Sequence, residues 1–333
     1  MTIWLGFLEK FGEENDKILE DPTVSKIGGR PTWINPKVIP RPDDLRCGIC
    51  EKIMRLLLQL YCPEAENCPM GYHRVIYIFV CEDGACQRPG FSKSFKVIRV
   101  QKENIKDSDT KMDHLCIVCN AMALYVCSKC KKTKYCSKQH QKVHWESALH
   151  KDYCGTLEDS KWPILKKAWW NEMEIVYEAE PEEEKPIGNE LIQHKFGPNA
   201  IPDKFEKFSR VKGDKAFLHF QKRLSREPSQ VLRYIRTELN NEKDEDILWI
   251  GLEGQLDSSK IAECPCGEKR TIEFQIMPTL LSFLNIDHSE RYSLDWGVLN
   301  IYTCEKSCKL ANSHICEELL WRQEISNEII TGT

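Results

Sequence analysis

The sequence has no long apolar segment. Among its 333 residues the longest uninterrupted apolar run is Val75 to Cys81, whereas a membrane-spanning helix needs about 18 to 20 apolar residues. We therefore expect no membrane-spanning helix. The first residues, Met1 to Phe7, lack the basic and then long apolar stretches of a secretory signal. We expect a reducing compartment, where disulfides do not persist, so the 17 cysteines should be metal ligands or free thiols.

An excess of positive charge is also absent. The chain has 47 Lys and Arg residues against 51 Asp and Glu residues, which gives a formal net charge of -4. This charge argues against broad nucleic-acid binding through phosphate contacts, so direct nucleic-acid binding is not expected. An acidic chain suits a basic partner, although the same charge could simply keep the protein dispersed.

Catalytic motifs are missing as well. The chain contains no serine nucleophile elbow, no His-Glu-x-x-His zinc-protease helix and no dinucleotide-binding loop. The sequence therefore predicts a protein that is not an enzyme.

Cysteine and histidine are abundant between Cys116 and Cys154. Two residues separate the members of each leading cysteine pair, and such a pair can place both sulfurs on one ion. Residues four apart on a helix project from one face, so a cysteine and a histidine at that spacing can complete each site. The predicted cross-braced zinc sets are Cys116, Cys119, Cys136 and His140, and Cys127, Cys130, His150 and Cys154. His144 is the rival of His140.

Two further cysteine sets flank predicted strands in the first and last thirds of the chain. Each has one pair before a strand and one pair after the next strand, which is how a metal clamps distant strand ends. They are Cys47, Cys50, Cys81 and Cys86, and Cys264, Cys266, Cys304 and Cys308. Cys62 and Cys68 could compete but have a poorer spacing, and Cys316 has no partner. About four zinc ions, each held by four protein ligands, are predicted as structural rather than catalytic. Their thiolates would bring the net charge to about -10.

The first and last thirds repeat one pattern. Trp33 and Trp249 precede cysteine pairs by similar distances, and each pair leads to a strand containing Gln and then Pro. This order predicts an α+β fold, predominantly β, with duplicated zinc-stapled halves that face each other. The finger is predicted to be inserted between the two halves in the sequence and to stand apart from them on linkers. The predicted divisions are an N-terminal half at 1–108, a finger at 112–158, an acidic, partly disordered linker at 159–214 and a C-terminal half at 215–330.

The start of the C-terminal half reads as helical. Phe217, Phe220 and Leu224 form one apolar stripe of a predicted helix from Lys215, and a second short helix is predicted over residues 230–239.

The finger resembles the MYND finger, a protein-binding zinc module. His140 stands where most such fingers carry cysteine, and the family pattern favours it over His144, which lies just before the tryptophan. The same variant occurs in the programmed cell death two family. The resemblance to that family extends over nearly the whole chain, through Gly28-Gly-Arg-Pro-x-Trp33, Cys264-Pro-Cys-Gly267, Phe274-Gln-x-Met-Pro278 and Asp295-Trp-Gly297.

The resemblance implies a function. Members look like dedicated chaperones that capture one basic ribosomal protein, the eukaryotic small-subunit protein two, and escort it into 40S ribosome biogenesis in cytoplasm and nucleus. The alternative is an adaptor whose MYND finger recruits proline-rich peptides or transcriptional corepressors in the control of proliferation or apoptosis.

Overall fold

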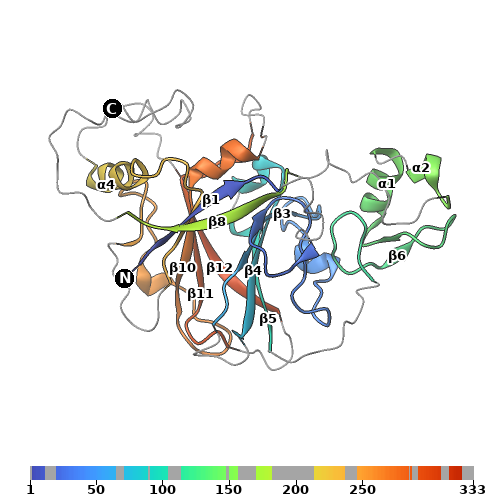
Figure 1. The fold of residues 1–333 in the computed structure, drawn as a ribbon, viewed down its shortest axis with the longest axis horizontal. Coiled ribbons are helices and arrows are strands. Elements are labelled where there is room, and N and C mark those ends of the chain that lie inside the picture. The colour runs from blue at the N-terminus through green and yellow to red at the C-terminus, as the bar shows by residue number, and fades with distance from the viewer. Residues whose placement is uncertain are drawn as a thin grey trace.

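Ten strands close into a single antiparallel barrel, and a small lobe projects from one side of it (Figure 1). The structure is a computed structural model that describes residues 2–11, 20–64, 71–88, 91–103, 114–147, 150–156, 170–181, 214–236, 246–284, 286, 292–308 and 315–324. Within these ranges, no helix combines the length and apolar character needed to cross a bilayer. The predicted β-rich α+β fold is confirmed.

Both thirds of the sequence supply barrel strands. The barrel consists of β1 (Trp4–Glu9), β2 (Lys26–Ile27), β3 (Arg55–Tyr61), β4 (His73–Val80), β5 (Phe95–Lys102), β8 (Met173–Ala179), β9 (Leu232–Tyr234), β10 (Arg270–Ile276), β11 (Val298–Cys304) and β12 (Ile315–Gln323). The lobe contains β6 (Tyr125–Val126), β7 (Lys134–Tyr135), α1 (Lys138–Ser147) and α2 (His150–Tyr153), and α4 (Lys215–Leu224) covers the barrel on the opposite side (Figure 1).

The two halves are joined in one sheet. Strands β2 to β5 follow one another in the N-terminal half, and β9 to β12 do so in the C-terminal half. Strand β5 pairs with β12 on one side, while β1 and β8 lie between β9 and β2 on the other. The two halves therefore form one body, and the closed barrel leaves no open groove between them. A four-stranded sheet has two unpaired edges, and closing the barrel satisfies them.

The internal repeat extends to details of the strands. Leu57 in β3 and Glu273 in β10 each occupy a bulge, two residues before a buried glutamine. Gln59 accepts a hydrogen bond from the backbone N–H of Thr32 at 2.8 Å, and Gln275 accepts one from that of Leu248 at 2.9 Å. These donors directly precede Trp33 and Trp249. The same glutamine therefore anchors the equivalent loop in both halves.

Apolar side chains cover both surfaces of the sheet. Ile76 and Ile78 of β4 meet Ile301 of β11 in a shared interior cluster. On the outer surface, Trp33 packs on Tyr77 with ring centroids 4.6 Å apart. The predicted helix from Lys215 is confirmed as α4, whose apolar stripe packs against Met277 and Val298.

Two local predictions are wrong. Strand β8 lies within the predicted acidic linker 159–214 and pairs with β1 and β2, while residues 159–169 and 182–213 of that segment lie outside the described residues. Glu180, from the acidic run, is half-buried and pairs with Arg223 and Arg233. Residues 230–236 do not form the predicted helix, because β9 pairs there with β1 and β10, and residues 237–239 lie outside the described residues. Long-range pairing overrides local propensity at both places.

Candidate metal centres

The structure gathers all sixteen predicted ligands into four groups. In each group the candidate ligand atoms lie within 4.8 Å of one another. The groups are Cys47, Cys50, Cys81 and Cys86; Cys116, Cys119, Cys136 and His140; Cys127, Cys130, His150 and Cys154; and Cys264, Cys266, Cys304 and Cys308. These are the same sets, including the cross-braced pair, that the residue spacing predicts.

The separations between sulfur atoms fit tetrahedral zinc. A zinc–sulfur bond of about 2.3 Å places two ligand sulfurs about 3.8 Å apart, whereas a disulfide bond is about 2.05 Å long. The Sγ atoms of Cys50 and Cys81 are 3.6 Å apart, and those of Cys127 and Cys154 are 3.8 Å apart. In the other two groups the corresponding distances are 3.5 Å for Cys119 and Cys136, and 3.5 and 3.7 Å for the pairs Cys264–Cys308 and Cys266–Cys304.

A shared backbone turn shapes three of the four leading cysteine pairs. The residue directly after the second cysteine has a positive φ, at 59° for Glu51, 54° for Asn120 and 61° for Lys131. Its backbone N–H donates to the carbonyl of the first cysteine at 2.9 to 3.0 Å. This left-handed residue turns the chain so that both sulfurs point to one centre. Such backbone costs about 1 kcal/mol or more and persists where the surroundings enforce it.

The C-terminal pair uses a tighter version of this turn. Only one residue separates Cys264 from Cys266, and Gly267 follows with a φ of 87°. The N–H of Gly267 donates to the carbonyl of Cys264 at 2.8 Å. Glycine adopts this conformation without a steric cost, so the shorter spacing still brings both sulfurs into one set.

The rival residues take other roles. His144 is buried beside the second finger set, where its Nδ1 lies 2.9 Å from the hydroxyl of Tyr135 and its ring stacks on His150. Burial raises the pKa of Cys62 and of Cys316 to about 12, so both thiols are neutral at physiological pH. Neither belongs to a metal group. Cys68 lies outside the described residues.

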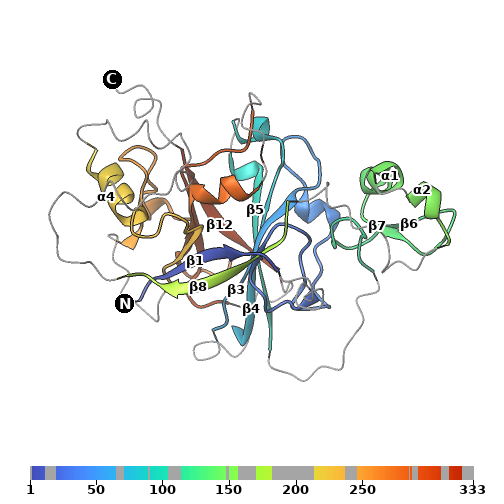
Figure 2. The same cartoon turned by 45° about the horizontal axis from the view of Figure 1, so that its top comes forward.

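The finger is docked onto the barrel through its first cysteine pair. The indole N–H of Trp33 donates to the carbonyl of Asn120 at 2.6 Å, and the Asn120 amide donates to Pro31 at 2.9 Å. Arg30 donates to the carbonyl of Ile117 at 3.0 Å. The expectation that the finger stands apart on linkers is wrong, because the turn at Gly28 brings Trp33 and Arg30 against it. Figure 2 shows that β6 and α2 remain at the far end of the lobe.

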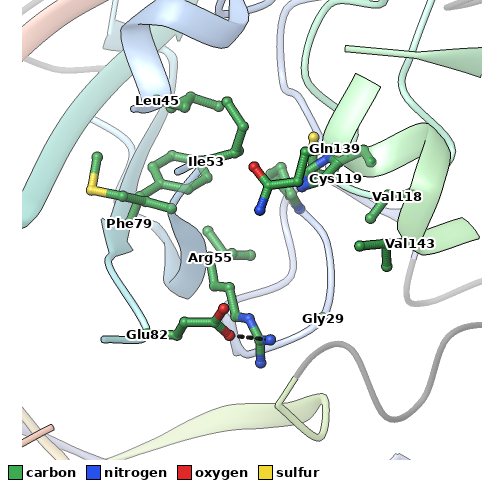
Figure 3. A pocket seen from close by; sticks show the side chains of 14 residues that line it. Gly29, Leu45, Ile53, Arg55, Phe79, Glu82, Val118, Cys119, Gln139 and Val143 are labelled. Carbon is green, nitrogen blue, oxygen red and sulfur yellow. Dashed lines mark ion pairs between the residues drawn. The ribbon is translucent and has the colours of Figure 1, made fainter. Parts of the chain in front are cut away.

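A pocket lies at the seam between finger and barrel (Figure 3). Its walls mix apolar and polar side chains, and the ion pair between Arg55 and Glu82 lies at one side. Gln139 and Val143 of α1 face Ile53 and Phe79 of the barrel half across it. The pocket can therefore receive an apolar side chain next to a charged group.

The comparisons with known proteins cover most of the chain. The family models of programmed cell death protein 2 match residues 2–113 for the N-terminal domain and 214–324 for the C-terminal domain, and the MYND finger model matches residues 116–154. The finger sets are therefore those of a zinc-binding module.

Relatives of similar length support the same family. Programmed cell death protein 2 of Bos taurus is 32% identical over 349 residues, which cover 97% of this chain and 96% of that protein. Programmed cell death protein 2-like of Homo sapiens is 25% identical over 359 residues, covering 92% of each chain. A Schizosaccharomyces pombe protein, probable 20S rRNA accumulation protein 4, is 34% identical over 86 residues, which cover 26% of this chain and 20% of that protein. No solved structure matches the chain.

Proposed function

The chain belongs to the programmed cell death protein 2 family, and from that membership we propose that it is a dedicated chaperone for one basic ribosomal protein. The client is the eukaryotic small-subunit protein two, which the chain binds during or just after synthesis and escorts into 40S biogenesis, in cytoplasm and nucleus. The partial likeness to a fission yeast protein named for ribosomal RNA accumulation supports this role.

The acidic charge outside the finger carries the proposal. Residues 114–156 have seven lysines and two carboxylates, a formal +5, so the rest of the chain accounts for -9 of the total of -4. Two zinc ions held by eight thiolates outside the finger would lower this charge by about 4 more. A ribosomal protein without its RNA is strongly basic. An acidic surface therefore attracts and steers it.

The metal sets support binding rather than catalysis. Each of the four groups offers four protein ligands, which fills a tetrahedral ion and leaves no position for water or substrate. We accordingly assign the ions a structural role, with about four zinc ions per chain, and assign the protein no chemical reaction.

Because the barrel is closed, we expect the client to bind on its outer surface. Within the described barrel every strand pairs with a neighbour on each side, so no strand offers a whole free edge to an extended client segment. Contacts through side chains are therefore expected. The seam pocket offers apolar side chains beside Glu82, whose side chain is 45% exposed, and suits a segment that carries apolar and basic residues.

Affinity purification of the full chain from cells tests the proposal. The small-subunit ribosomal protein should be the main stoichiometric partner, and raising the salt concentration should release it, because screening weakens attraction between exposed charges. Depletion of the chain should lower the soluble pool of that protein and the output of new small subunits, while large subunits continue to form. Normal small-subunit output would contradict the proposal.

An adaptor is the second candidate function. Leu124, Tyr125 and Val126 are exposed by 57%, 44% and 47%, and β6 lies at the edge of a two-stranded sheet. An extended proline-rich or corepressor peptide could add to this edge. Leu124→Asp should abolish capture of such a peptide and leave the ribosomal client bound. Purification of corepressors without any ribosomal protein would favour the adaptor instead.

A further inference from the structure

The finger has the opposite charge to the rest of the chain. Its formal charge of +5 comes from seven lysines and the carboxylates of Glu146 and Asp152, and residues 114–156 contain no arginine. Each zinc ion held by three thiolates and one histidine lowers the charge by one, so the loaded finger keeps about +3. The negative net charge of the whole chain therefore does not exclude nucleic-acid binding by this lobe.

Exposed lysines gather at the end of the finger that faces away from the barrel. Cys130 Sγ lies 3.8 Å from His150 Nε2, so the second cysteine turn and α2 lie side by side. Figures 1 and 2 both place α2 and β6 at the far end of the lobe. The lysine surface consists of Lys129, Lys131, Lys132 and Lys151 beside the second cysteine turn and on α2, together with Lys138 and Lys142 on α1, all exposed.

Helix α1 extends this lysine surface. Lys138, Lys142 and Trp145 follow one another at helical spacing and share a face of α1. The Nζ atom of Lys129 lies 5.9 Å from the centroid of the Trp145 ring, which connects the helix face with the cysteine turn. None of the six lysines forms an ion pair with another described residue. Their charge is therefore available to an external anion.

Aromatic rings accompany the lysines. Tyr125 of β6 and Tyr153 of α2 are 44% and 41% exposed at the same end of the finger. Exposed rings beside positive charge provide stacking surfaces for unpaired bases, at about 1 to 3 kcal/mol per base.

We propose that the far end of the finger, formed by the lysine surface with Tyr125 and Tyr153, binds single-stranded RNA without sequence preference. The finger has lysines and no arginine, and lysine binds phosphate as a point charge without a fixed geometry, which suits contacts to the RNA backbone without sequence preference. Exposed rings also favour bases over acidic side chains. An acidic protein segment is therefore the less favoured partner.

This site is distinct from the proposed client site. The client is proposed to use the acidic barrel and the seam pocket, whereas RNA would use the lysine surface with Tyr125 and Tyr153, none of which lines that pocket. Loss of one activity leaves the other intact, so the two proposals fail separately.

Fluorescence anisotropy with a labelled 20-nucleotide uridine RNA and the full zinc-loaded chain tests the proposal. Combined substitution of Lys129→Glu, Lys131→Glu and Lys132→Glu should weaken binding at least about tenfold and reduce the slope of log K against log salt by about 2. The matched control substitutes Lys10→Glu, Lys215→Glu and Lys260→Glu, which are exposed lysines outside the finger that give the same change in charge. The control should bind within about twofold of the unsubstituted chain, apart from the general effect of net charge.

Zinc content and a peptide competitor complete the experiment. Unchanged zinc in both variants shows that the finger is still folded. Tyr125→Ala should weaken binding without changing the salt slope, because stacking carries no charge. Equal loss in the finger and control variants would overturn the proposal. Binding of a 20-residue polyglutamate peptide as tightly as the RNA would also overturn it, in favour of an acidic protein partner.

Discussion

Both carboxylate oxygens of Glu273 accept hydrogen bonds from Arg74, at 2.8 and 2.7 Å, in a place where neither side chain reaches solvent. Arg236 and the hydroxyl of Tyr234 bind the same carboxylate. Burial alone would raise the pKa of Glu273, but the nearby guanidinium groups hold it well below its usual range. The carboxylate is therefore charged, and it joins β4 of one half to β10 of the other.

Glu273→Gln should destabilise the protein by about 3 to 5 kcal/mol, because it leaves buried guanidinium groups without a full counter-charge. The control, Glu317→Gln, removes an exposed carboxylate paired with Lys96 and should cost no more than about 1 kcal/mol. Urea unfolding measures both. Similar small losses for the two variants would show that the buried network adds no stability.

The same variant should change the response to acid. A carboxylate whose pKa is depressed by folding contributes stability above the unfolded pKa of about 4.3, and this contribution is lost as the pH falls toward the folded value. Between neutral pH and about pH 3 the original chain should therefore lose more stability than Glu273→Gln. Parallel stability curves for the two proteins would contradict the assigned charge of Glu273.

Individual residues differed in how well sequence patterns predicted them. Cysteine spacing identified every member of the four metal sets, because a tetrahedral ion limits how far apart its ligands can be. Glu273 was missed because regular alternation places it on the opposite face of the strand from the interior residue Phe274. The bulge between Ile272 and Phe274 breaks this alternation, and Glu273 binds Arg74 instead. The residue types of Glu51 and Lys131 gave no indication of their positive φ, whereas a glycine such as Gly267 is typical of a turn with positive φ.

Strand β8 shows why an element can hide in a charged segment. Its sequence, Met173–Ala179, has apolar residues between glutamates, and the acidic run that follows resembles a solvated linker. In the structure Glu180 lies at the end of this strand and is bound by Arg233 at 2.6 Å. The partner arginine is 53 residues away in sequence. No local pattern could identify the pairing.

The contact between finger and barrel should depend on Arg30. Arg30→Ala removes the hydrogen bond to Ile117, so amide exchange should accelerate at residues 117–121 while β3 and β4 keep their protection. Arg46→Ala, which removes a partly exposed arginine paired with Asp43, is the control and should change neither region. An unchanged exchange rate at residues 117–121 in Arg30→Ala would mean that the finger docks without this contact.

Metal ligands in the finger and in the barrel should behave differently. Cys127→Ser should unfold the far part of the finger and leave barrel unfolding unchanged, because all four ligands of that set come from the finger. Cys81→Ser should lower the midpoint of barrel unfolding, because its ion holds the end of β4 to the segment before β3. Thermal unfolding with zinc analysis separates the two. An equal effect on the barrel transition would contradict separate roles.

The closed barrel could be predicted only in part. The first and last thirds of the chain have tryptophan, cysteine, glutamine and proline in the same order, and this order predicted the duplication. In the structure both halves have corresponding strands and bulges. Closure depends on β5 pairing with β12, where Val100 lies opposite Ile315. It also depends on β1 and β8, which have no counterpart in the repeat. Such distant pairings leave no mark on local periodicity.

The whole chain should carry about four zinc ions after purification. Elemental analysis should give about four ions per chain, and native mass spectrometry should show a single loaded species. Cys316→Ser is the control and should keep all four, because Cys316 belongs to no metal group. A value of two would mean that the cysteine sets in the barrel halves hold no metal.

Capture of the client by purified components is the most direct test of the proposed function. The eukaryotic small-subunit protein two, diluted from denaturant, should stay soluble in a one-to-one complex with the chain, measured by light scattering and size-exclusion chromatography. An unrelated protein of equal net charge should not protect it. Binding should weaken as salt rises, because the Debye length falls below about 8 to 10 Å. Aggregation of the client to the same extent with either protein would contradict the chaperone function.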